Sequence, residues 1–120
     1  MRCILIDPDH RTMSYIDIDE NQSKLEQFYQ HMECSLITSP IDFQNGDTLY
    51  VDDEGLFYVN PDTTFFRFRG YHHTLCGKGV IVGIDQHGNS VDCSTTIEEL
   101  QQLVEFVEYD NVTYPNYLFV

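Results

Sequence analysis

The segment from Thr63 to Ile84 gathers residues that can hold an anion. It contains no Asp or Glu, but it has half of the basic residues of the chain and two adjacent histidines. Arg67 and Arg69 are two residues apart on an expected strand, so their side chains project to the same face. Backbone N–H groups of a glycine turn can form a shallow anion nest. The segment therefore predicts a ligand site for an anionic nucleotide, built from Arg67, Arg69, His72, His73, Gly77, Lys78 and Gly79.

The same residues have an alternative interpretation without a ligand. Arg67 and Arg69 would then pair across strands with Asp52, Asp53 or another carboxylate, and the glycines would only satisfy turn geometry. The Gly77-Lys78-Gly79 turn also lacks the long loop and the Ser or Thr of a phosphate-binding P-loop. Both interpretations remain open from the sequence.

The acidic residues are the second group that could bind a partner. The chain has 20 Asp and Glu against 6 Lys and Arg, a formal net charge of −14. Carboxylates two residues apart on a strand are about 6.6 Å apart, whereas duplex DNA has one charge per roughly 1.7 Å of axis. One strand therefore cannot imitate DNA, and several elements would have to combine. We expect a partner-binding acidic surface at Asp17, Asp19, Glu20, Asp52, Asp53, Glu54, Glu98 and Glu99, extended by Asp7, Asp9, Asp42, Asp47, Asp62, Glu105 and Glu108. The alternative is a self-repelling surface that keeps the protein monomeric.

Catalytic and metal-binding signatures are absent from the sequence. It has no Gly-x-Ser-x-Gly, no dinucleotide glycine fingerprint, no Cys-x-x-Cys and no His-x-x-x-His. Cys76 near His72 and His73 is the single combination of a nucleophile and a base. We expect a protein that is not an enzyme, with no metal and no cofactor, and four free thiols rather than disulfides.

Length and composition predict one soluble domain over residues 1–120. No apolar run reaches the roughly 20 residues of a membrane span, and the N-terminus does not have the pattern of a signal peptide. A cytoplasmic location follows as an expectation. The negative charge disfavours direct contact with nucleic acid or with anionic lipid.

Local patterns predict the elements that must position these residues. A β-hairpin is expected over 2–7 and 12–18, and a helix over 22–33, where Ser23 and Glu26 fit a capping box. Further β-like runs are 35–43, 48–52, 56–60, 65–69, 79–84 and 90–93. A second capping box at Thr95 predicts a final helix along Ile97, Leu100, Val104 and Val107, and an aromatic segment, 109–120, is expected to dock on the domain. The order predicts an α+β fold with an antiparallel or mixed sheet and two helices packed on one face.

Three stretches resemble a family of small, functionally unassigned proteins of bacteriophages and mobile elements. They are Ile-Leu-Ile-Asp-Pro at 4–8, Leu-Tyr-Val-Asp-Asp-Glu-Gly-Leu at 49–56, and Gly-Lys-Gly-Val-Ile-Val-Gly at 77–83, and the resemblance continues to Glu98-Glu99-Leu100. It departs from the family pattern at Cys76 and in the aromatic tail. The resemblance implies a phage or plasmid setting and no known chemistry.

These observations lead to three functional hypotheses. The first is an acidic inhibitor that binds a basic host protein, such as a nuclease, a nucleoid protein or a defence factor, by nucleic-acid mimicry in the bacterial cytoplasm. The second is the nucleotide binder built on residues 63–84. The third is an assembly protein, such as a homodimer, that self-associates through a strand at 114–120.

Overall fold

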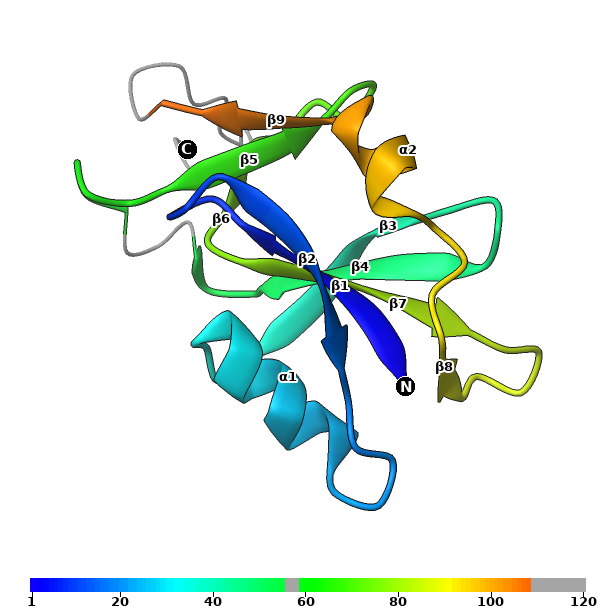
Figure 1. The fold of residues 1–120 in the computed structure, drawn as a ribbon. Helices are drawn as coiled ribbons and strands as arrows, with labels where there is room; N and C mark the ends of the chain where they lie inside the picture. The colour runs from blue at the N-terminus through cyan, green and yellow to red at the C-terminus, as the bar shows by residue number, and fades with distance from the viewer. Residues whose placement is uncertain (56–58, 109–120) are drawn as a thin grey trace.

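The computed structural model describes residues 1–55 and 59–108, which form nine strands and two helices (Figure 1). These are β1 (Arg2–Asp7), β2 (Thr12–Asp17), α1 (Lys24–Met32), β3 (Ile37–Asp42), β4 (Asp47–Asp52), β5 (Phe65–Phe68), β6 (Leu75–Cys76), β7 (Gly79–Ile84), β8 (Ser90–Val91), α2 (Ile97–Gln101) and β9 (Val104–Val107).

Two antiparallel sheets make up the β structure. The larger has the order β2-β1-β7-β4-β3, with β8 added to β7, and the smaller has the order β6-β5-β9. Every strand pairing is antiparallel, and β3 has a register shift between Thr38 and Ile41, next to Pro40. β7 lies at the centre of the larger sheet and is almost wholly buried. Its continuous apolar sequence follows from this position, because both of its faces are covered.

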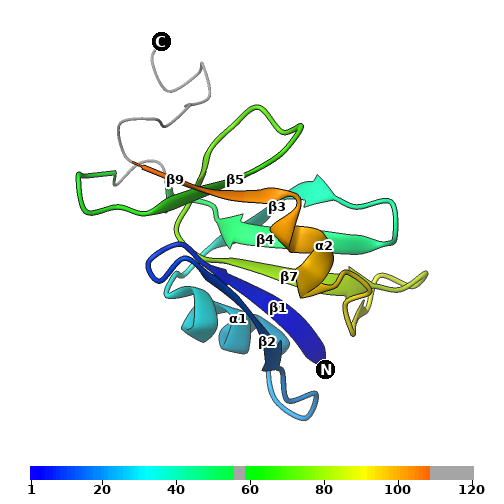
Figure 2. The ribbon, with the colours of Figure 1, turned by 45° about the horizontal axis from the view of Figure 1, so that its top comes forward.

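The larger sheet has a different layer on each face. Cys3 and Val80 point toward α1, where Phe28 and Met32 are buried. Alternate residues on the same strands, such as Ile4, pack on the other face against the smaller sheet and α2. Figures 1 and 2 show α1 on one side and β5, β9 and α2 on the other. The α+β class with antiparallel sheets is confirmed, but the two helices lie on opposite faces and not on one.

The first helix forms where its sequence predicts it. The Ser23 hydroxyl accepts a hydrogen bond from the backbone N–H of Glu26 at 3.2 Å, which satisfies one of the N–H groups that a helix start leaves without a partner. Glu33 ends the helix in a left-handed conformation, with φ 56°, and its N–H bonds to Tyr29. The hairpin of β1 and β2 and the turns at 44–47 and 86–89 are also confirmed.

The predicted final helix is wrong in its second half. α2 ends at Gln101, and Val104–Val107 forms strand β9, which pairs with β5. The spacing of Val104 and Val107 fits a helix, but the sequence Val-Glu-Phe-Val also alternates and is rich in strand-forming residues. Hydrogen-bonded pairing with β5 stabilises the strand rather than the helix. The N-cap is Thr96, not Thr95, and its side chain accepts from the Glu99 N–H.

Two expectations concern residues outside the described ranges. The strand predicted over 56–60 includes residues 56–58, and the docked segment at 109–120 is wholly outside. Within residues 1–55 and 59–108, no helix is long and apolar enough to span a membrane.

A buried carboxylate explains why Thr95 does not cap the helix. Asp47 is 2% exposed and was expected among the surface acids. Its oxygens accept hydrogen bonds from the backbone N–H groups of Ser94 and Thr95, at 2.7 to 3.0 Å, and from the Thr95 hydroxyl at 2.6 Å. Asn45 donates its amide to the same hydroxyl at 2.9 Å. The start of β4 therefore holds the segment that leads into α2.

Removing the Asp47 carboxylate should destabilise the whole domain. Asp47→Ala removes the acceptor of the Ser94 N–H and leaves the buried Thr95 N–H and hydroxyl without theirs, and we expect a loss of about 2 to 4 kcal/mol in the free energy of unfolding. Urea denaturation followed by circular dichroism measures it. The matched control is Asp53→Ala, which removes an exposed carboxylate from the other end of β4 and should change stability by less than about 0.5 kcal/mol. Equal effects of the two substitutions would contradict this role of Asp47.

Candidate binding site

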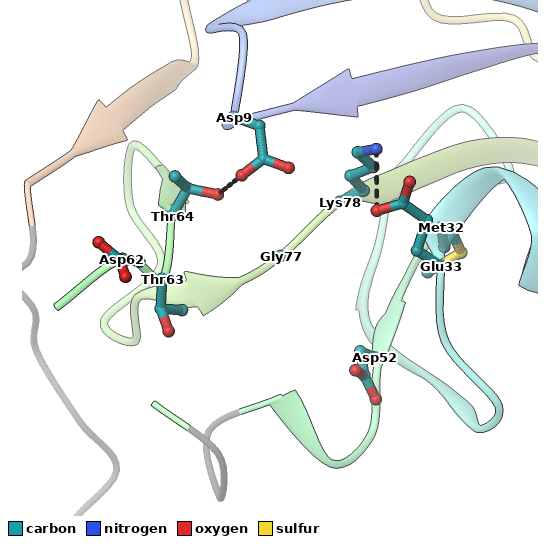
Figure 3. A pocket seen from close by; sticks show the side chains of 9 residues that line it. All are labelled: Asp9, Met32, Glu33, Asp52, Asp62, Thr63, Thr64, Gly77 and Lys78. Carbon is teal, nitrogen blue, oxygen red and sulfur yellow. Dashed lines mark hydrogen bonds and ion pairs between the residues drawn. The ribbon is translucent and has the colours of Figure 1, made fainter. Parts of the chain in front are cut away.

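A pocket of about 200 Å³ lies at the end of the larger sheet where the β1–β2 turn, the end of α1 and the end of β4 meet. Residues 62–64 and the Gly77-Lys78 turn complete it (Figure 3). Carboxylates from four separate segments line it, and one amine lies among them. The charged lining residues are Asp9, Glu33, Asp52, Asp62 and Lys78.

The backbone of the pocket is fixed by local geometry. Gly77 has φ 77°, which favours glycine, and its N–H bonds to the Thr64 carbonyl at 3.0 Å. This turn places Lys78 between β6 and β7. The left-handed Glu33 brings its carboxylate to the same place from α1. The Thr64 hydroxyl donates to Asp9 at 2.5 Å and joins the β1–β2 turn to the segment before β5.

The positive charge of Lys78 is balanced by a neighbouring carboxylate. Its amine lies 3.3 Å from the Glu33 carboxylate, and its side chain is only 14% exposed. Burial raises the pKa of Asp7, but hydrogen bonds from the His10 ring and backbone and the charge of Lys78 outweigh burial, so the pKa of Asp7 is lowered. Four lining carboxylates against one amine make the pocket negative. Such a pocket repels a phosphate and attracts an organic cation such as a lysine or arginine side chain.

The structure brings together some of the predicted acids and separates others. Asp52 lies in the pocket, with Asp53 and Glu54 following it. Asp17 on β2 lies opposite Arg2 on β1 in the strand register. The register across β1, β7 and β4 places this end of β2 at the Asp47 end of the sheet. Asp19 and Glu20 follow it. Since β4 has six residues at about 3.3 Å each, the two groups of acids are separated by the length of the sheet.

The remaining predicted acids, Glu98 and Glu99, lie on the face opposite α1. Both are exposed on α2, and the Glu99 N–H donates to Thr96. Glu105 was expected on the final helix with them, but it lies on β9. The predicted acids therefore occupy three places on the molecule.

Most of the predicted anion site is engaged within the protein. Arg67 donates to Glu105 at 2.7 Å across the β5–β9 pair, as in the interpretation without a ligand. Arg69 is exposed beyond the end of β5 and does not share its strand. His72 is exposed, while His73 is half-buried with its ring edge against Tyr71. Gly77 and Lys78 line the pocket, so the seven residues do not form one site.

Gly79 has a packing role. A Cβ atom at this position would lie 2.8 Å from the ring of Phe66 and 3.1 Å from Leu49. The missing side chain thus lets the smaller sheet approach β7 closely, and the space beside Gly79 is filled from within the core.

Sequence reasoning missed the role of Glu33 and the grouping of Asp9 with Asp62. The position of the Glu33 carboxylate depends on the left-handed backbone at the end of α1. No sequence pattern predicts a left-handed conformation at an acidic residue. Asp9 and Asp62 line one pocket although their segments are distant in the sequence, and the hydrogen bond from Thr64 to Asp9 joins these segments. No signal within either local stretch could have paired them.

Comparison with known proteins confirms one part of the resemblance seen in the sequence, membership of a family without an assigned function. Residues 1–105 match the model of DUF3846, a domain of unknown function. The chain belongs to this family. No curated protein and no solved structure matches it. The match ends within β9, so the DUF3846 domain includes the pocket and nearly all of both sheets.

The cysteine that could act as a nucleophile lies in the interior of the DUF3846 domain. Burial raises the pKa of Cys76 to about 11, and its Sγ donates to the carbonyl of Gly55. A reactive cysteine needs a lowered pKa and partial exposure. Among residues 1–55 and 59–108, no group of three or more His, Cys, Asp or Glu is placed to hold a metal ion.

These pKa directions predict the order of thiol labelling. Burial also raises the pKa of Cys3 to about 12, and the pKa values of Cys34 and Cys93 are raised as well. A rise from 9.0 to about 11 for Cys76 lowers its thiolate fraction about 100-fold at pH 8. Because only Cys34 is half-buried rather than buried, it should react with iodoacetamide first.

Peptide mapping by mass spectrometry after timed labelling gives the order. Cys34→Ser should abolish the fast phase, and denaturant should restore reaction at the other three cysteines. Fast labelling of Cys76 in the folded protein would contradict its assignment as an unreactive interior thiol.

Proposed function

We propose that this protein binds and inhibits a basic, nucleic-acid-binding protein of a bacterial host, using its acidic surface in place of nucleic acid. The family has no assigned function, and the phage or mobile-element setting comes from the resemblance in the sequence. A binding role accords with the charge distribution of the pocket and of the sheet ends. In that setting the partner is a nuclease, a nucleoid protein or a defence factor.

The observation that carries the proposal is that five of the six Lys and Arg side chains contact other groups of the protein, while fourteen described carboxylates are exposed. Arg11 pairs with Glu108, Arg67 with Glu105 and Lys78 with Glu33. Lys24 donates to the Ser90 carbonyl, and Arg2 donates to the Cys93 carbonyl and lies over the Tyr15 ring. Fourteen described carboxylates are exposed: Asp9, Asp17, Asp19, Glu20, Glu26, Glu33, Asp42, Asp53, Asp62, Asp92, Glu98, Glu99, Glu105 and Glu108.

Two groups of acids lie at opposite ends of the larger sheet. Asp17, Glu20 and Asp92 surround the N-terminal amine and raise its pKa, and the largest cause is the hydrogen bond that the amine donates to Asp17. The other group lines the Lys78 pocket. A basic groove that contacts both ends would meet two separate groups of negative charge, which one strand could not supply.

Capture from a bacterial lysate tests the proposal. The tagged full-length chain should retain a basic nucleic-acid-binding protein at about 0.15 M salt and release it at about 0.5 M, because salt screens surface charge. Duplex DNA added to the lysate should compete for the same partner. Capture of no such protein, or capture that resists both salt and DNA, would contradict the proposal.

Charge variants identify the contacting surface. Asp17→Asn, Asp19→Asn and Glu20→Gln combined with Asp52→Asn and Asp53→Asn remove five charges, and we expect affinity for the captured partner to fall at least about tenfold. Surface plasmon resonance measures the affinity. The control is Arg67→Ala, which removes a cation paired with Glu105 and should bind at least as tightly as the wild type. Loss of binding in the arginine variant alone would favour an anionic ligand at residues 63–84.

A further inference from the structure

A groove of about 790 Å³ lies between the end of the β3–β4 hairpin, the loop after β5, and α2 with Leu103 just before β9. It is separate from the Lys78 pocket and shares no residue with it. Figure 2 shows the three segments that bound it, with α2 between the two sheets. Its volume lies within the range of about 300 to 1,000 Å³ typical of ligand sites.

Aromatic and aliphatic side chains form the floor of the groove. The rings of Phe43 and Phe68 are 5.7 Å apart at a tilted angle. Phe68 is buried, but Phe43, Tyr71 and Leu103 are only half-buried, so their free sides face the groove. Apolar surface that lines an open groove can receive a side chain of a partner.

Charged groups stand at the rim of the same groove. Asp42 and Glu99 are exposed lining residues, and each makes one hydrogen bond, with Thr48 and with Thr96, that leaves its second oxygen open. Arg69 also lines the groove, and of the cations in residues 1–55 and 59–108 it is the one whose side chain makes no ion pair or hydrogen bond. Its backbone N–H donates to the Leu103 carbonyl at 2.8 Å, which fixes the position of its Cα beside β9.

We infer that this groove, called the Tyr71 groove below, binds an extended segment of a basic partner in which an apolar side chain is flanked by lysines or arginines. The apolar side chain fills the space over Phe43 and Tyr71. The flanking cations face Asp42 and Glu99, in agreement with the net charge of −14. The Arg69 guanidinium, which has five N–H donors, bonds to backbone carbonyls of the segment. This inference rests on the proposed function and adds the anchor that charge alone does not give.

Three synthetic peptides distinguish an anchored segment from charge attraction. They are acetyl-Lys-Lys-Phe-Leu-Lys-Lys-amide, the same peptide with Gly-Gly at its centre, and the same peptide with Glu in place of Lys. Titration into the isotope-labelled full-length chain at about 0.15 M salt is followed by NMR. Only the first should shift the amides of residues 41–45, 69–71 and 99–103 as one group. Equal shifts from the Gly-Gly peptide, or shifts confined to the acids at the two sheet ends, would overturn the inference.

Two variants test the anchor and the rim separately. Tyr71→Ala should weaken the first peptide about tenfold. Asp42→Asn with Glu99→Gln keeps both hydrogen-bond acceptors, so it should fold normally, and it should weaken binding about fivefold. The control, Glu26→Gln with Asp85→Asn, removes the same charge from residues that line neither the groove nor the Lys78 pocket and should leave the affinity within about twofold of wild type.

The outcomes separate this inference from the proposed function. If both groove variants bind the peptide as the wild type does, the inference fails. If they also capture the lysate partner in a salt-dependent manner, the proposed function stands without the groove. Failure of capture by the wild-type chain contradicts the proposed function itself.

Discussion

The buried Asp47 carboxylate joins the two halves of the chain. It begins β4, in the middle of the larger sheet, and accepts hydrogen bonds from the segment that leads into α2. Burying a carboxylate is costly unless its oxygens are satisfied, and here two backbone N–H groups and a hydroxyl satisfy them. Through this contact the position of α2 is set against the sheet, and β9 follows α2 after two residues.

The layers built on this contact decide which parts of the surface are open to a partner. α1 covers one face of the larger sheet, and the smaller sheet with α2 covers the other. Both faces of the larger sheet are therefore covered by other elements. The loops lie at the two ends of the sheet and at the groove beside α2. The acid-rich groups lie at the ends, and the Tyr71 groove lies beside α2. Binding surfaces made of loops on a rigid scaffold are the usual arrangement in such folds.

The sequence predicted the elements whose cause is local. The first helix has its cap and its apolar stripe within one short stretch, and the apolar β7 and the hairpin turns are equally local. Val104 to Val107 was misassigned because its pattern fits both a helix and a strand, and pairing with β5 decides the matter. Asp47 was predicted to be a surface acid because the residues next to it in the sequence do not indicate its contact with Thr95, 48 residues later. The candidate site was predictable only in part for the same reason, since the pairing of Lys78 with Glu33 also depends on the tertiary structure.

The chain has 20 Asp and Glu against 6 Lys and Arg, and most of these cations contact other groups of the protein. The proposed function requires that the acidic exterior be a binding surface and not only a source of solubility. Hydrogen exchange of the full-length chain, with and without the partner retained at low salt, decides between the two. A binding surface should show slower exchange on complex formation at residues 17–20 and 52–54, at the two ends of the larger sheet, and recovery of fast exchange when salt is raised to about 0.5 M. Protection confined to the 69–73 loop or to the edge strand β2, and unchanged by salt, would contradict it.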